Sequence, residues 1–327
     1  MIARRFFCSD LAQQVGALTN RPFSNPHATD DPCAVSWVGQ APAPPANVAL
    51  WAYHVADPAG ALDKRWMDAT LTWRRDTLVH HWTTGSTCPG TATSYAQTRG
   101  IFERYDALLR PVNMSLVRHV VRTWLFVRNI GADYDGVVTA RREFFHEQGL
   151  TPETHFIAST GIEGAPTDPA AMVALDAYAV AGLRPEQIAF LAAPDYMGPT
   201  HAYGVTFERG TAVSYRDRRH VFVSGTASID PQGRILHAGD VARQLDRTLE
   251  NFDAVLRKAG ATFQDVCVLI AYVRHPGDLT AVRQRVLARC GTVPTEVVVA
   301  PICRLGWLVE IEGQAIVHAA CPELPPF

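Results

Sequence analysis

The feature that most constrains the fold of this chain is an internal repeat. Apolar residues at helical spacing mark residues 244–256, and the same pattern occurs 147 residues earlier, at residues 97–109. Strand-like apolar runs follow both patterns, at residues 120–127 and 266–273. With further matching segments, each half has the order β-β-α-β-α-β-β. The repeat predicts two related α+β domains with mixed sheets and helices packed on one face.

The repeat divides the chain into three predicted parts. Residues 76–185 form the first domain, and residues 186–327 form the second. Residues 1–75 precede the repeat and contain a break, Gln-Ala-Pro-Ala-Pro-Pro, at residues 40–45. A strand-like run at residues 48–53 indicates that this extension packs on the first domain.

A short segment of the second domain places polar groups among apolar residues. Residues 300–312 contain two apolar runs separated by a Leu-Gly turn, which predicts a β-hairpin. Period-2 alternation places Glu310 and Glu312 on one face of the second strand. Burial of an acid in such a strand, close to Cys303 and Arg304, raises its pKa and suits it to catalysis. The segment therefore indicates an enzyme.

The two domains differ at this point. An alignment that contains one gap places Ala174 opposite Glu310 and Asp176 opposite Glu312. The acid at position 310 then belongs to the second domain alone. We expect the second domain to carry most of the active site and the degenerate first domain to contribute structure and one wall.

Composition argues against several other classes of function. The 327 residues are 47% hydrophobic and carry a formal net charge of -2, so no basic excess favours nucleic acid. No run approaches the roughly 20 apolar residues of a membrane span, and the first residues lack a signal-peptide pattern. We therefore expect a cytoplasmic protein that binds neither nucleic acid nor membrane.

The sequence predicts neither a bound metal nor an organic cofactor. Its seven cysteines are scattered without a C-x-x-C pair, which favours reduced thiols over disulfides or a structural zinc site. His80 and His81 are adjacent, so in a strand they point to opposite faces and chelate poorly. The dinucleotide-binding, Walker and lysine Schiff-base motifs are absent.

Several motifs of the second domain resemble the Rid/YjgF superfamily. They are the Ser-Gly-Thr-Ala-Ser-Ile run at residues 224–229, the helix at residues 244–256 and the Val-Glu-Ile-Glu run at residues 309–312. Simple members deaminate imines with an arginine two residues after the proline that opens the penultimate strand. In this chain Glu296 stands two residues after Pro294, which argues against imine deamination.

Most of residues 90–317 resembles a narrower group, the chorismatases, which are two-domain Rid-like enzymes that act on chorismate. The resemblance rests on residues 156–164, 203–210, 224–229 and 303–310. Subclasses of this family hydrolyse chorismate to a dihydrodiol or convert it to 3-hydroxybenzoate, 4-hydroxybenzoate or both.

Two residues indicate the subclass. A cysteine and a glutamate seven residues apart mark the hydroxybenzoate-forming chorismatases, and Cys303 and Glu310 have this spacing. The hydrolases are expected to carry an amide at the glutamate position. Ala227 lies where the subclasses vary between alanine and glycine, so it leaves the choice open.

The resemblance and the chemistry of chorismate together predict roles for individual residues. Loss of the pyruvyl group needs protonation of the enol-ether methylene carbon, and Glu310 is the predicted general acid. Cys303 either acts as a nucleophile, which requires a lowered thiol pKa, or shapes the pocket. The predicted substrate-binding residues offer guanidinium groups for two carboxylates, a hydroxyl, a phenol and backbone groups: Arg142, Arg209, Arg304, Thr160, Tyr203, Gly161 and Ala227.

We therefore predict a cofactor-independent lyase of aromatic and secondary metabolism that converts chorismate to 3-hydroxybenzoate, 4-hydroxybenzoate or both, and releases pyruvate. Three alternatives stay open: a chorismate hydrolase that forms a dihydroxycyclohexadiene carboxylate, an imine deaminase, and a non-catalytic Rid-fold protein that binds a small acid. Simple Rid proteins are trimers with sites between subunits, whereas a duplication can satisfy such contacts within one chain. The sequence is compatible with a monomer and with a homotrimer.

Overall fold

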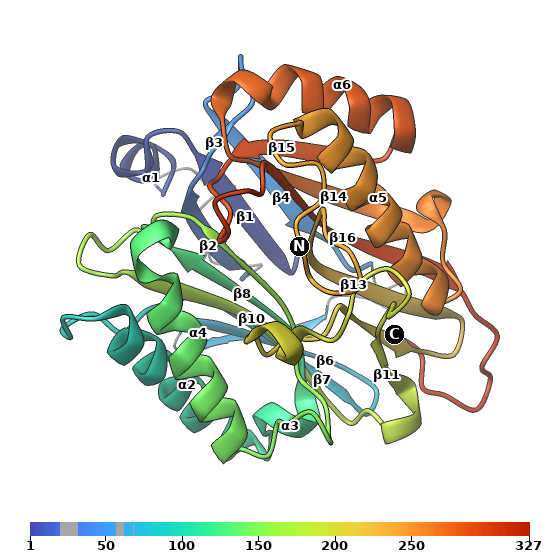
Figure 1. The fold of residues 1–327 in the computed structure, drawn as a ribbon. Coiled ribbons are helices and arrows are strands. Elements are labelled where there is room, and N and C mark those ends of the chain that lie inside the picture. The colour runs from blue at the N-terminus through green and yellow to red at the C-terminus, as the bar shows by residue number, and fades with distance from the viewer. Residues whose placement is uncertain (20–31, 57–61, 68) are drawn as a thin grey trace.

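The computed structural model describes residues 1–19, 32–56, 62–67 and 69–327 of the chain. Within these ranges, three β-sheets are accompanied by helices (Figure 1). The α-helices are α1 (Leu11–Thr19), α2 (Ser94–Leu109), α3 (Leu116–His119), α4 (Ile130–Glu147), α5 (Val241–Lys258) and α6 (Leu279–Cys290). No helix in the described residues is long and apolar enough to cross a membrane.

Apart from the short strand β3, the sheets follow one another along the chain. The first, of order β2-β1-β4, contains β1 (Ala3–Cys8), β2 (Ala34–Gly39) and β4 (Val48–Tyr53). The second, of order β5-β6-β7-β10-β8-β9, contains β5 (Asp63–Met67), β6 (Thr70–Arg75), β7 (Leu78–Ser86), β8 (Val120–Val127), β9 (Ala158–Glu163) and β10 (Val173–Ala181). The third, of order β11-β12-β13-β16-β14-β15-β3, contains β3 (Ala41–Pro42), β11 (Ile188–Leu191), β12 (Gly210–Ser214), β13 (Arg218–Ala227), β14 (Val266–Val273), β15 (Thr295–Val299) and β16 (Val309–His318).

The second and third sheets repeat one topology, which confirms the predicted fold class. In each, an antiparallel strand pair leads to a long helix, and a parallel strand pair flanks a second helix. Helices α2 and α4 pack together against the six-stranded sheet, and α5 and α6 cover the seven-stranded sheet (Figure 1). The first helices also begin alike, because the side chains of Thr93 and Asp240 accept hydrogen bonds from the backbone N–H groups of Ala96 and Arg243.

The N-terminal segment contacts both halves of the repeat. Gly39 at the end of β2 exchanges backbone hydrogen bonds of 2.9 and 3.2 Å with Ala165, which follows β9. Strand β3 pairs with β15 at the edge of the third sheet. Strands β5 and β6 precede residue 76 in the chain, yet they belong to the second sheet. The N-terminal segment therefore joins the two halves.

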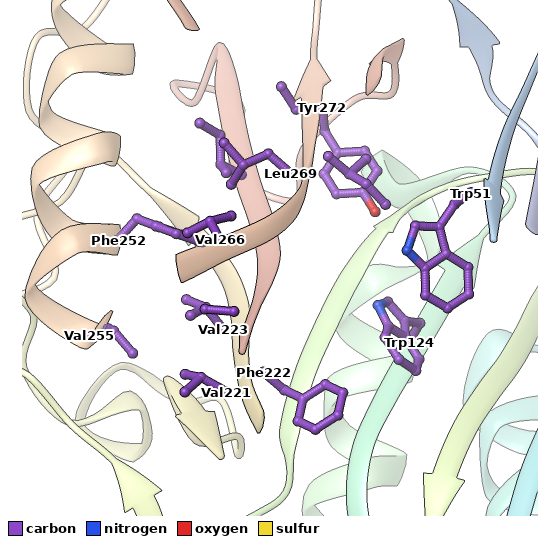
Figure 2. Packing of buried hydrophobic residues seen from close by; sticks show 14 of the residues in the cluster. Trp51, Trp124, Val221, Phe222, Val223, Phe252, Val255, Val266, Leu269 and Tyr272 are labelled. Atoms are coloured by element: carbon purple, nitrogen blue, oxygen red, sulfur yellow. The ribbon is translucent and has the colours of Figure 1, made fainter. Parts of the chain in front are cut away.

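Side chains from all three sheets meet in an aromatic core. Trp82 of β7 stacks on Tyr178 of β10 with ring centroids 4.5 Å apart, and Tyr178 lies 5.7 Å from Phe222 of β13. Trp51 of β4 lies 5.9 Å from Trp82. Figure 2 shows Trp51, Trp124 and Phe222 in this region. Burial of each ring contributes about 2 kcal/mol, so this packing holds the halves in a defined arrangement.

The predicted hairpin at residues 300–312 is wrong. Residues 300–308 form a loop, although the turn at Leu305 and Gly306 and the strand from Val309 agree with the prediction. Strand β15 pairs in parallel with one edge of β14, and β16 pairs in antiparallel with the other edge. The loop therefore crosses β14. Two apolar runs that lie close in sequence do not determine which strand each of them joins.

Candidate active site

A cavity of about 510 Å³ lies between the two halves, and this volume is typical of a site for a small molecule. From the first half, α4 contributes side chains between Tyr134 and Arg142, and β9 contributes two further residues. From the second half come the segment before β12, the end of β13, the loop from Cys303 to Trp307, and Glu310 of β16. The site is thus built from both halves of one chain.

Eight of the nine residues predicted from the sequence line this cavity. They come from both halves: Arg142, Gly161, Tyr203, Arg209, Ala227, Cys303, Arg304 and Glu310. The ninth, Thr160, is not among the lining residues, because alternation along β9 turns it away from the direction of its neighbours Ser159 and Gly161.

Thr160 instead holds two neighbours of the cavity. Its hydroxyl donates to the Glu312 carboxylate and accepts a 2.9 Å hydrogen bond from the backbone N–H of Gly225. Arg122 also donates to this hydroxyl, at 2.5 Å. These three partners use the donor and both acceptor positions of the hydroxyl, so the geometry favours a structural role for Thr160 over the predicted contact with substrate.

Glu310 is the buried acid of the site. It lies on β16 between Ala227 of β13 and Tyr272 of β14, and it is 5% exposed. Burial and, to a smaller extent, the charge of Glu312 raise the pKa of its carboxyl from 4.5 to about 8, against the opposing charges of Arg122 and Arg209. Glu310 is therefore protonated at neutral pH and can donate that proton into the cavity.

Glu312 has a different environment, although it lies on the same face of the same strand. Its carboxylate accepts hydrogen bonds from Arg122 at 2.7 Å, and from the Trp124 indole and the Tyr272 hydroxyl at 3.0 Å each. A buried carboxylate with this many donors is satisfied by the protein itself. Glu312 therefore has a structural role, and its charge helps to keep Glu310 protonated.

Cys303 is a neutral thiol. Burial and, to a smaller extent, the charge of Glu310 raise its pKa from 9.0 to about 12, although a hydrogen bond with Tyr134 and the charge of Arg304 act in the opposite direction. Because the thiolate is the nucleophilic form, a thiol with this pKa is not activated for attack at neutral pH. Of the two roles predicted for Cys303, the geometry supports the shaping of the pocket.

Two predicted arginines are held by aromatic side chains. The Arg304 guanidinium lies 4.8 Å from the ring centre of Tyr203 and 4.9 Å from that of Trp307. Arg209 donates to the Tyr203 hydroxyl and, at 3.1 Å, to the carbonyl oxygen of Gly198, while its buried Nε has no protein acceptor. These contacts orient both cations without neutralising them, so both can accept an anionic ligand.

Arg141 is a site residue that the sequence reasoning missed. Its side chain is buried, it lies near Tyr134 and Cys303, and its Nε and Nη2 have no hydrogen-bond acceptor. An unpaired buried cation is costly, and a bound carboxylate removes that cost. Helical periodicity could have found it, because Arg141 falls on the buried face of α4 with Val137 and Phe144, whereas Arg142 is exposed.

No group of three or more His, Cys, Asp or Glu side chains suited to a metal ion occurs in the part of the chain that the structure describes. The cavity is lined by one buried carboxylic acid, one neutral thiol and four guanidinium groups, with the carboxyl group of Asp135 exposed at its edge, and its volume fits a small polyanion. The arrangement can bind two carboxylates and deliver a proton to a carbon or oxygen atom between them.

Some comparisons with known proteins match the second half of the chain alone, and others match both halves. The family described as Endoribonuclease L-PSP matches residues 211–317. A RutC family protein from Pyrococcus abyssi is 31% identical over 98 residues, which are 30% of this chain and 77% of the relative. These matches cover a single half of the repeat.

Two other relatives cover both halves. A protein from Streptomyces rapamycinicus described as a chorismatase is 32% identical over 248 residues, which are 70% of each chain. A crystal structure of a chorismatase superimposes with a TM-score of 0.70 and 21% identity, over 96% of this chain and 92% of that chain. The likeness therefore extends across the cavity between the halves.

Proposed function

The chain belongs to the chorismatase family, and we propose that it converts chorismate to 3-hydroxybenzoate, 4-hydroxybenzoate or both, with release of pyruvate. The observation that carries this proposal is Glu310, a buried carboxylic acid with a pKa of about 8 that faces a cavity lined by arginines. It stands seven residues after Cys303, which is the spacing expected of a hydroxybenzoate-forming enzyme.

The proposed reaction conserves atoms and charge. Chorismate is a dianion, and hydroxybenzoate and pyruvate together contain the same atoms and the same two charges. Glu310 donates its proton to the enol-ether methylene carbon, and the bond between the ring and the bridging oxygen breaks with its electron pair on that oxygen. Pyruvate leaves, and the ring cation rearranges or directly loses a proton to become aromatic. The Glu310 carboxylate is then positioned to take up this proton, so the cycle needs no net acid.

The arginines have a role that follows from the two carboxylates of chorismate. Arg141 is buried with unused donors, and Arg209 and Arg304 are oriented by Tyr203, so these three groups are the proposed carboxylate ligands within the cavity. Arg142 is exposed at the rim of the cavity, where its charge attracts the dianion.

In the proposed mechanism, Cys303 determines whether the ring cation loses a proton or reacts with water. A ring cation that captures water becomes the dihydroxycyclohexadiene carboxylate, whereas one that loses a proton becomes the aromatic acid. The Cys303 thiol lies near Glu310 and is not ionised, so it occupies volume without providing a nucleophile. It therefore favours the aromatic products by excluding water from the cation.

The decisive experiment is incubation of the purified protein with chorismate, followed by chromatography and an enzymatic assay for pyruvate. Equal amounts of pyruvate and hydroxybenzoate are expected. Pyruvate with the diol and no aromatic acid would assign the hydrolase instead. Binding of an aromatic dicarboxylate in a calorimeter without turnover of chorismate would assign a non-catalytic protein, and ammonia release from an enamine would assign an imine deaminase.

A further inference from the structure

The loop that carries Cys303, Arg304 and Trp307 is held by a side chain outside the cavity. Arg274, which follows β14, donates from Nε to the carbonyl oxygen of Trp307 at 2.6 Å and from Nη2 to that of Arg304 at 2.7 Å. Nη2 also donates to the carbonyl oxygen of Ile302. One guanidinium thus binds three carbonyls of a loop that has no helix or strand.

Gln244, near the start of α5, holds the adjoining residues of the same loop. Its side-chain nitrogen donates to the carbonyl oxygen of Gly306 at 2.8 Å, and its Oε1 accepts from the backbone N–H of Leu308 at 2.8 Å. Gln244 is fully buried, and neither Gln244 nor Arg274 is among the residues that line the cavity. Neither side chain therefore contacts a ligand in the cavity. Both act on it through the loop backbone, and the charge of Arg274 also acts on Cys303, so an Arg274→Lys variant, which keeps that charge, separates the two effects.

The first half contains the same arrangement around a loop that lines no part of the cavity. Arg128, which follows β8, donates to the carbonyl oxygens of Ala171 at 2.9 Å, Asp168 at 2.7 Å and Pro166 at 3.0 Å. Each of these acceptors stands 136 residues before its counterpart in the second half. The nitrogen atoms that donate are also the same, Nε to one carbonyl and Nη2 to two.

Gln97 of α2 completes the match. Its side-chain nitrogen donates to the carbonyl oxygen of Ala170 at 3.1 Å, and its Oε1 accepts from the backbone N–H of Met172 at 2.8 Å. We call this set of contacts the loop clamp, formed by Arg128 and Gln97 in the first half and by Arg274 and Gln244 in the second. Because the clamp is present around a loop without cavity residues, it is a feature of the fold that does not depend on catalysis.

We propose that the clamp of the second half has acquired a second role, in which Arg274 and Gln244 are positioning residues for the conversion of chorismate. This inference rests on the proposed function. An unclamped loop of this length has many backbone conformations, and only one of them places Cys303 beside Glu310 and Arg304 over Tyr203. A misplacement of about 1 Å can lower a rate about 100-fold. The clamp of the first half has no such consequence, since its loop carries no group that meets the substrate.

The test is a matched pair of substitutions, Arg274→Gln and Arg128→Gln, in the full chain. Both are expected to lower the melting temperature by a similar amount, because each removes the same three hydrogen bonds. Arg274→Gln is expected to raise KM for chorismate, to lower kcat/KM roughly 10- to 100-fold and to increase the share of diol among the products. Arg128→Gln is expected to leave KM and the product ratio unchanged. The proposal is overturned if the two variants lose activity equally, or if Arg274→Gln retains the kinetics of the wild type.

Two additions keep the test decisive. Arg274→Lys and Arg128→Lys retain a cation with fewer donors, and they replace the glutamine pair if Arg274→Gln does not fold. The rate at which N-ethylmaleimide labels Cys303, followed by peptide mass spectrometry, requires no turnover. Faster labelling of Cys303 in the Arg274 variant than in the Arg128 variant supports the positioning role, whatever the outcome of the turnover assay. Failure of the wild type to convert chorismate would reject the proposed function and not the positioning of the loop. Equal labelling together with equal activity would reject the positioning role.

Discussion

The central strands of the two halves, β10 and β16, occupy equivalent places and differ in one decisive side chain. Ala174 pairs with Phe126 of β8, and Glu310 pairs in the same way with Tyr272 of β14. One position thus holds a methyl group in the first half and the proposed proton donor in the second. The same place in the repeated fold therefore carries an apolar side chain in one half and a buried carboxylic acid in the other.

Two residues further along these strands, both halves carry an acid. Asp176 and Glu312 stand at equivalent places, and Arg5 of β1 lies between them, at 2.9 Å from the Asp176 carboxylate and 3.7 Å from that of Glu312. An acid at this place is therefore paired in each half. The comparison separates a structural acid that both halves contain from the proposed catalytic acid, which only the second half contains.

The largest expected effect tests this separation directly. Glu310→Gln removes the transferable proton and retains the shape of the side chain, so hydroxybenzoate formation should fall about 10²- to 10⁴-fold. The measurement is the initial rate of pyruvate release, with circular dichroism to verify the fold. The matched variant in the first half is Asp176→Asn, which leaves Arg5 without its closest partner and should cost about 3–5 kcal/mol of stability while catalysis in the folded fraction continues. Retention of the wild-type rate in Glu310→Gln would remove Glu310 from the mechanism.

A glycine at the equivalent position of each half extends the comparison to the space beside Glu310. Gly225 precedes the β13 residue that pairs with Ile311, and Gly85 precedes the β7 residue that pairs with Leu175. A Cβ at Gly225 would come within 2.1 Å of the Glu310 Oε1 atom, whereas a Cβ at Gly85 meets no atom within 4 Å.

Gly225→Ala should therefore displace the Glu310 carboxyl and lower kcat/KM roughly 10- to 100-fold. Gly85 has a φ of 61°, so Gly85→Ala should cost about 1 kcal/mol of stability and leave kcat/KM unchanged. Steady-state kinetics and thermal melts of both variants check the pair. Equal kinetic losses would mean that the close approach of Gly225 to Glu310 has no functional importance.

The pH dependence of catalysis is expected to follow the pKa of Glu310. Only the protonated carboxyl donates, so kcat/KM should fall as the pH rises through about 8, and by about tenfold for each further unit. Initial rates between pH 6 and pH 10 would show this decrease. A decrease that begins near pH 5 would mean that burial does not hold the proton on Glu310, and the acid role would then fail at neutral pH.

The local parts of this structure could be predicted from the sequence. Strands β8 and β14 begin and end where the apolar runs indicate, because a buried strand needs apolar side chains at consecutive positions and can be seen in a short stretch of sequence. The equivalence of Ala174 and Glu310 is confirmed by the ladders, and no gap is needed there, since the interval of 136 residues also relates Thr160 to Glu296.

What could not be predicted depends on contacts between distant residues. The pairing of β16 with β14 rather than with β15 is decided by the whole sheet and not by the turn at residues 305–306. In the same way, alternation along β9 does not tell which face of that strand meets the cavity; that depends on the packing of the two sheets, in which Thr160 contacts Glu312, 152 residues away. The choice of Arg141 over Arg142 is different, because it follows from the apolar periodicity of α4 and was accessible from the sequence.

A last expected effect concerns stability, which Glu310→Gln should raise above about pH 8 although the same substitution lowers activity. The pKa of Glu310 is about 8 in the folded protein and close to 4.5 in the unfolded chain, so the folded state binds a proton that the unfolded state lacks between these values. The stability of the wild type should therefore decrease, relative to Glu310→Gln, as the pH rises from 4.5 to about 8, because the amide does not titrate. Urea denaturation at pH 5 and at pH 8.5 measures this, and the glutamine variant should gain stability over the wild type at the higher pH. Glu310 would then lower the stability of the second half at high pH, whereas Ala174, at the equivalent position in the first half, does not titrate and has no such effect. A difference between variant and wild type that stays constant over this range would show that the site does not hold its acid protonated.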